Sequence, residues 1–126
     1  MAEMQCVEVL SNRLRVRIPV QSILYVDISQ NASLLHTDNG VVKTYMTFTN
    51  MRALLERSAN CFLTCYKGRL VNMNRIAGVV ETAAGAGGVW IDFVMDNGER
   101  VQVRKRDGKK IRQAYVLYRC AQTVSA

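Results

Sequence analysis

Apolar and polar residues alternate along much of this chain, and a period of two residues is that of a β-strand rather than of a helix. Residues 14–18 place apolar side chains at every second position, with arginines between them. Residues 23–28 are rich in β-branched and aromatic side chains and follow Pro19. Both segments predict strands, and a chain built from such segments folds mainly as β-structure.

Two Asp-Asn-Gly tripeptides, at residues 38–40 and 96–98, predict where strands reverse direction. Asn-Gly supplies the positive φ angles that a type I′ turn requires, so each tripeptide predicts a hairpin closed by such a turn. The segments paired in this way are residues 33–37 with 41–47, and residues 89–95 with 99–104. Further extended segments are predicted at residues 61–66, 69–72 and 76–81.

Helices are predicted at two places. The first can be capped by Thr49 or Asn50, carries apolar side chains at positions 51, 54 and 55, and ends at residues 58–60. A closing helix from about residue 108 to 120 has an apolar side. The glycine-rich residues 83–88 predict a loop, since no following Lys-Ser/Thr makes them a phosphate cradle. The predicted fold class is mainly β with one or two short helices.

The length of 126 residues gives room for one domain with its own core. The chain contains no apolar run long enough to span a bilayer, and its start lacks the basic and apolar regions of a signal peptide. We therefore expect a single domain over residues 1–126 that stays in the cytoplasm without membrane insertion.

Residues that could carry catalysis or hold a metal are few. The single histidine, His36, lies just before a turn and is expected to be structural or solvent-facing. Cys65 is close in sequence to a lysine but has no partnered histidine, and the four cysteines are expected to be reduced thiols, packed in the core. We expect no enzyme, no metal site and no cofactor.

The charge distribution is more informative. The formal net charge is +7, and much of the excess lies between Arg100 and Arg112, where Asp107 is the only acid. By composition alone, a solvated basic face and a nucleic-acid site weigh equally. Lys67 and Arg69, on either side of a glycine, form a second cluster that could meet phosphates or guanine edges. This second cluster favours nucleic-acid binding.

Residues 62–76, Phe-Leu-Thr-Cys-Tyr-Lys-Gly-Arg-Leu-Val-Asn-Met-Asn-Arg-Ile, resemble the central signature of LytTR-type DNA-binding domains. In that signature an aromatic residue and an Arg-x-His-Arg-Ser-Tyr-like loop precede a Leu-Val-Asn strand and an isoleucine. Residues 19–27 are similar to the family's Pro-x-x-x-Ile-x-Tyr-Ile-Glu strand, and residues 101–106 stand where the family has a Pro-Val-Ser-Arg-Arg run. The resemblance covers roughly residues 16–118.

The resemblance implies a bacterial transcription factor module: a stack of small antiparallel sheets whose loops enter successive major grooves of double-stranded DNA. By this resemblance Asn31, Lys67 and Lys105 match the base-contacting positions of three loops. The DNA-binding residues expected are, in chain order, Asn31, Lys67, Arg69, Arg104, Lys105 and Arg106. The Asn31 amide could pair with an adenine edge, and the arginines beside Lys105 could hold phosphates.

The chain also departs from the family pattern. The family's Arg-x-His-Arg-Ser is Thr-Cys-Tyr-Lys-Gly at residues 64–68, and a lysine cannot form arginine's planar fork, so the preferred DNA site should differ. Asp107 replaces the usual tyrosine of the third loop. No room remains for the receiver domain that commonly precedes this module, so we expect a stand-alone regulator or a module cut from a longer protein.

Three contacting loops would cover about one turn of duplex, so high affinity is expected to need repeated half-sites bound by a monomer or weak homodimer. The alternative function left open is a small basic β domain that binds RNA or acts as a protein-interaction scaffold. The basic run has few aromatic residues for stacking on single strands, and this counts against RNA.

Overall fold

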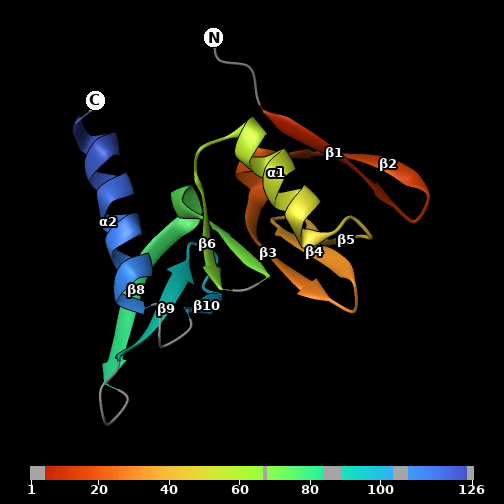
Figure 1. Cartoon of the computed structure of the whole chain (residues 1–126). Helices are drawn as coiled ribbons and strands as arrows, with labels where there is room; N and C mark the ends of the chain where they lie inside the picture. Colours follow the sequence, from red (N-terminus) through yellow and green to blue (C-terminus); the bar gives the residue numbers. More distant parts are fainter. Residues whose placement is uncertain (1–4, 67, 84–88, 104–107, 125–126) are drawn as a thin grey trace. The chain divides into compact units, whose positions relative to one another are not determined.

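The computed structural model describes residues 5–66, 68–83, 89–103 and 108–124 (Figure 1). The chain forms two compact units, residues 1–74 and residues 75–126. Each unit is built around its own antiparallel strands, and each is described by itself below.

The first unit contains a five-stranded antiparallel sheet in the order β5-β4-β3-β7-β6, together with a separate two-stranded hairpin of β1 and β2. One α-helix, α1 (Phe48–Ser58), joins β5 to β6. The strands are β1 (Cys6–Ser11), β2 (Leu14–Pro19), β3 (Ile23–Ser29), β4 (Ala32–Thr37), β5 (Gly40–Thr44), β6 (Phe62–Tyr66) and β7 (Arg69–Asn72). Short 3-10 turns occur at η1 (Val20–Ser22) and η2 (Met73–Arg75).

The second unit contains a three-stranded antiparallel sheet in the order β10-β9-β8 and the closing helix α2 (Gly108–Val124). Its strands are β8 (Ile76–Ala83), β9 (Val89–Met95) and β10 (Arg100–Val103). Helix α2 packs against β9, where the Tyr115 ring meets the Phe93 ring edge-on at 5.4 Å between centroids. The predicted class, mainly β with small antiparallel sheets and short helices, is confirmed.

Most predicted elements are found, with differences at their ends. The strand β1 was not predicted, although its sequence alternates. Helix α1 is capped by Thr47, whose hydroxyl oxygen accepts a hydrogen bond from the Asn50 backbone N–H at 3.2 Å, so the predicted caps Thr49 and Asn50 are wrong. Strand β5 ends at Thr44, three residues early, and α2 continues to Val124. Residues 84–88 of the predicted glycine-rich loop lie outside the described residues.

The predicted type I′ turns at the two Asn-Gly pairs are wrong. Only the glycines, Gly40 (φ 117°) and Gly98 (φ 92°), have positive φ, and the asparagines before them do not. In the second hairpin, Gly98 N–H donates to the Met95 carbonyl at 2.9 Å, as in a type I turn followed by a glycine bulge. The extra residue of such a loop needs one left-handed position, which glycine takes without strain.

Two-residue turns with positive φ at both central positions do occur, at other places. Asn12 and Arg13 join β1 to β2 with φ of 53° and 65°, and Gln30 and Asn31 join β3 to β4 with φ of 50° and 67°. This is the φ pattern of type I′ turns, whose twist matches that of the flanking strands. The second of these turns carries the candidate base-contacting residue Asn31.

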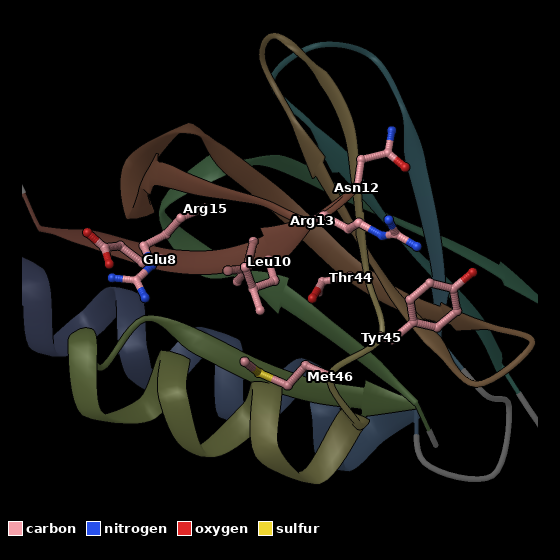
Figure 2. A pocket seen from close by; sticks show the side chains of 9 residues that line it. Glu8, Leu10, Asn12, Arg13, Arg15, Thr44, Tyr45 and Met46 are labelled. Carbon is pink, nitrogen blue, oxygen red and sulfur yellow. The ribbon is translucent and has the colours of Figure 1, made fainter.

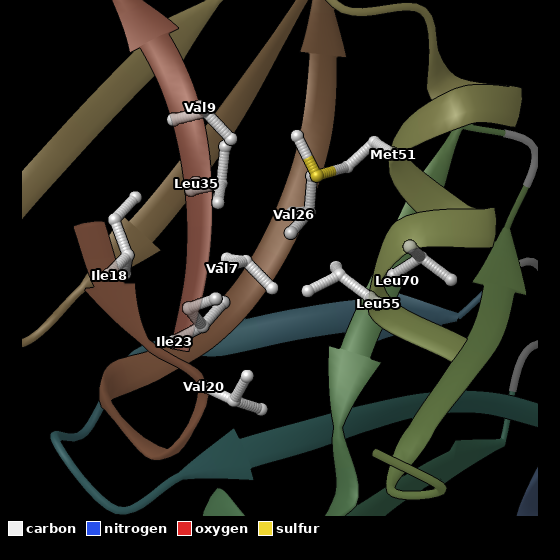
Figure 3. Packing of buried hydrophobic residues seen from close by; sticks show 10 residues of the cluster. All are labelled: Val7, Val9, Ile18, Val20, Ile23, Val26, Leu35, Met51, Leu55 and Leu70. Carbon is white, nitrogen blue, oxygen red and sulfur yellow. The ribbon is translucent and has the colours of Figure 1, made fainter. Parts of the chain in front are cut away.

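The core of the first unit lies between α1, the β1–β2 hairpin and one face of the five-stranded sheet (Figure 3). Val26 of β3 and the residues opposite it on the neighbouring strands, Leu35 of β4 and Leu70 of β7, supply the sheet side of this core. Met51 and Leu55, four residues apart on α1, are fully buried against them. The apolar side chains that recur every second residue on the strands and every three to four residues on α1 therefore pack into one interior.

Asn72, the asparagine of the Leu-Val-Asn segment, has a structural role. It is buried, its side-chain amide donates to the Ile23 carbonyl of β3 at 2.9 Å, and its oxygen accepts from the Asn74 backbone N–H at 3.0 Å. The residue thus ties the end of β7 to the start of β3 and closes the following turn.

All four cysteines are free thiols, and two of them, Cys61 and Cys65, are buried. Burial raises the pKa of the Cys65 thiol to about 12, against a smaller opposing effect of the Arg69 guanidinium, and burial also raises the pKa of Cys61. A raised thiol pKa means that the folded state favours the neutral form, which fits packing in a core.

Stability should fall with alkaline pH because of Cys65. In the unfolded chain this thiol loses its proton near pH 9, whereas the folded chain retains it up to about pH 12, so the unfolded state binds fewer protons in this window. We expect the free energy of unfolding to drop by about 1 kcal/mol more between pH 8 and pH 10 in the native chain than in Cys65→Ala. Urea titrations at both pH values measure this difference, and parallel losses in the two proteins would contradict it.

Candidate nucleic-acid interface

Asn31 lies at the tip of the β3–β4 hairpin and is exposed. Its φ of 67° is in the left-handed region, where asparagine is among the few non-glycine residues that are tolerated. The β3–β4 register leaves only Gln30 and Asn31 for the reversal, so the Asn31 side chain stands at the tip of a tight turn. A small hollow of about 230 Å³ lies beside it, lined by residues that include Ile28, Met46 and Phe48.

The turn between β6 and β7 lies at the same end of the sheet as the Asn31 turn. Strand β3 pairs antiparallel with β7, with Val26 opposite Leu70, so β7 begins where β3 ends. Gly68, with φ of 82°, approaches β3 so closely that an added Cβ would lie 3.3 Å from the Ile28 side chain. Lys67 itself lies outside the described residues, and the described Gly68 lies against β3 just before the β3–β4 turn.

Arg69 is directed at an acid of the same sheet. Its Nη2 lies 3.8 Å from Asp27 Oδ2, and its side chain is 28% exposed. The other oxygen of Asp27 is 3.1 Å from Nε2 of His36, whose ring stacks on Tyr25 at 4.1 Å between centroids. His36 thus makes structural contacts within the sheet, and Arg69 contributes to holding β3 and β7 together immediately behind the Gly68 turn.

The candidate residues Arg104, Lys105 and Arg106, with Asp107, lie outside the described residues. The chain enters this segment from the buried Val103 at the end of β10 and leaves it at Gly108, where α2 begins. Two flanking arginines of the basic run are paired with acids of the second unit. Arg100 Nη1 lies 3.6 Å from Asp92 Oδ2, and Arg112 pairs with Glu81. Part of the positive charge between residues 100 and 112 is therefore balanced locally.

Among the residues that the structure describes, the Asn31 turn and Gly68 of the second candidate loop lie at one end of one sheet. Sequence reasoning missed the hollow beside Asn31, because its lining comes from the distant Met46 and Phe48 as well as from the turn itself. Among the described residues, no three His, Cys, Asp or Glu side chains gather closely enough to hold a metal ion. Within the same residues, no helix is long and apolar enough to cross a membrane.

A family model described as the LytTr DNA-binding domain matches residues 14–115 of this chain. The chain belongs to the LytTR family of DNA-binding domains. This match spans both units and includes β2 to β10 and the first part of α2, so the family assignment made from the motifs is confirmed.

A solved structure supports the same fold for the LytTR domain described here. It is the LytTr DNA-binding domain of a putative methyl-accepting/DNA response regulator from Bacillus cereus. The two chains are 19% identical and superpose with a TM-score of 0.64, over 93% of this chain and 94% of that chain. A search of curated proteins found no match. At this level of identity the likeness shows the fold alone.

Proposed function

We propose that this LytTR domain binds specific sequences of double-stranded DNA and regulates transcription, through loops that enter the major groove. The observation that carries the proposal is the exposed Asn31 at the β3–β4 turn, near Gly68 of the next turn, in a chain of net charge +7 that belongs to a DNA-binding family. Competition among duplex DNA, single strands and structured RNA at moderate salt tests it. Preference for single strands or RNA would overturn it in favour of the alternative reading.

Different residues are proposed to have different roles in this complex. Asn31 and Lys67 read bases, Asn31 through a bidentate amide–adenine contact and Lys67 as a point charge near a base edge. Arg104, Lys105 and Arg106 form the third contact, with Lys105 toward a base and the arginines on phosphates. Arg69, paired with Asp27, is proposed to contact DNA from the base of the second loop while keeping that loop in place.

Binding should weaken strongly as the salt concentration rises. Basic side chains that bind phosphates release the counterions condensed on the DNA, and this release is less favourable at high salt. Replacing Arg104 or Arg106 by alanine is expected to weaken binding nearly equally on all sequences, and to reduce the slope of log K against log salt by about one unit. The matched control is Arg57→Ala, which removes an exposed arginine of α1 with no proposed DNA contact. Slopes that stay unchanged in the Arg104 and Arg106 variants would remove this run from the interface.

High affinity is proposed to require two copies of the domain on repeated half-sites, assembled from monomers or a weak homodimer in the bacterial cytoplasm. Copies about one helical turn apart lie on the same face of the duplex and can bind cooperatively. Shifting one half-site by about five base pairs should abolish this cooperativity, because the second copy moves to the opposite face. Footprint titrations on such spacing variants measure this cooperativity. Tight binding of one copy to a single half-site, independent of the spacing, would show that no second copy is needed.

A further inference from the structure

An open groove of about 870 Å³ runs between the β1–β2 hairpin and the segment that follows β5 (Figure 2). Val9 and Thr44 are buried and form its floor. Leu10, Tyr45 and Met46 form its apolar walls. The volume falls in the range of pockets that hold ligands. Among the residues that the structure describes, none of the proposed DNA-binding residues lines this groove, which shares only Met46 with the hollow beside Asn31.

The walls of the groove expose large apolar side chains to solvent. Leu10 is 61% exposed and Tyr45 is 73% exposed, although both line a concave surface. Exposed apolar residues scattered singly are common on proteins, but residues gathered around a hollow are typical of an interaction surface. The occupant of this groove should therefore supply apolar side chains.

The rim of the groove is basic. Arg15 lies toward one end of the groove and Arg13, with Tyr45, toward the other (Figure 2), and neither arginine makes an ion pair with any residue that the structure describes. Lys43 adds a third cation, since its Nζ lies 5.2 Å from the centroid of the Tyr45 ring. Glu8 is the one acid among the described lining residues. An occupant with carboxylates would complement this excess of positive charge.

We propose that this groove docks an acidic segment of a partner protein, with apolar side chains seated on Leu10, Tyr45 and Met46 and carboxylates paired with Arg13 and Arg15. A second copy of the chain fits less well, because it would bring the same basic rim against this one. Duplex DNA also fits less well, because its phosphate backbone offers no apolar groups to cover the groove walls. The proposal does not depend on which loops contact DNA.

A random peptide library displayed on phage and selected on the full chain tests the proposal. We expect the enriched peptides to combine Asp or Glu with large apolar residues. A fluorescent copy of the most enriched peptide should bind Leu10→Ser and Arg15→Glu with a Kd raised about tenfold. The NMR signals of the Leu10, Tyr45 and Met46 amides in the native chain should shift when this peptide is added. This measurement does not depend on whether a substituted chain folds.

The same hairpin offers matched controls. Leu14 is as exposed as Leu10, and Arg17 lies on the same strand as Arg15, but neither lines the groove. Leu14→Ser and Arg17→Glu should therefore change the Kd by less than about twofold. Equal losses in control and groove variants would overturn the proposal, as would enrichment of basic or purely apolar peptides. Self-association that Leu10→Ser abolishes would assign the groove to a second copy, and an equal loss of duplex binding would assign it to DNA.

Discussion

Replacing Leu55 by alanine is expected to lower the free energy of unfolding of the first unit by about 2–5 kcal/mol. Leu55 is fully buried where α1 packs on the sheet, in one cluster with Met51 of the helix and Leu70 of β7. In a close-packed core such neighbours move only partly into the space that a shortened side chain leaves. The cost therefore includes the lost burial of the side chain and the cavity left behind. Urea titration followed by circular dichroism, with hydrogen exchange at the amides of β3, measures it.

Leu14→Ala removes the same atoms from a position that is 68% exposed, and should change stability by less than about 0.5 kcal/mol. Because β3 and β7 carry the two neighbouring candidate loops, DNA binding by Leu55→Ala should disappear in parallel with the unfolding of this unit. Similar stability losses in the two variants would show that Leu55 does not lie in the core described above.

Removing the Asn31 side chain should cost about 1–3 kcal/mol on the preferred duplex and much less on random duplex, because only the specific complex would use the amide. Asn31→Gly is the best variant, since glycine adopts a φ of 67° without strain and the turn is preserved. Asn31→Ala should show the same loss of specificity together with a loss of stability, because alanine is strained at this φ. Fluorescence anisotropy titrations on both duplexes measure the difference.

Gln30 provides the matched control, since it is the other central residue of the same turn, is exposed, and also has positive φ. Gln30→Gly alters the turn in the same way while it retains the Asn31 amide, so it should leave the ratio of specific to random binding unchanged. Equal losses on specific and random duplex in Asn31→Gly would reject a base-reading role for Asn31.

Local sequence patterns predicted most elements of the fold, because the spacing of apolar residues that distinguishes a strand from a helix can be recognised within a short stretch of chain. The alternation at residues 14–18 and 23–28 predicted β2 and β3, and the spacing of Met51, Leu54 and Leu55 predicted α1. The ends of elements were less well predicted. Thr47, Thr49 and Asn50 can all cap a helix by residue type, and the packing of Met51 and Leu55 on the sheet selects among them.

The turns illustrate the same limit. Asn-Gly is compatible with a type I′ turn and with a type I turn that places glycine in a bulge. Residues 96–98 adopt the second, and at residues 38–40 only the glycine has positive φ. Conversely, Gln30 and Asn31 adopt positive φ without an adjacent glycine, because the β3–β4 register leaves only two residues for the reversal. The shape of the Asn31 loop could not be predicted from its own residues.

The sequence by itself determined the strand and helix periods, the basic character of residues 100–112 and, through the motif around Leu70, Val71 and Asn72, the family. Only the tertiary structure decided that the Asn31 and Gly68 turns lie at one end of one sheet, that Arg69 faces Asp27, and that Leu10 and Tyr45 line a groove. The physical reason is that such neighbours depend on which strands pair and in which register. Pairing is decided by the burial of side chains far apart in the chain, and no local period specifies it.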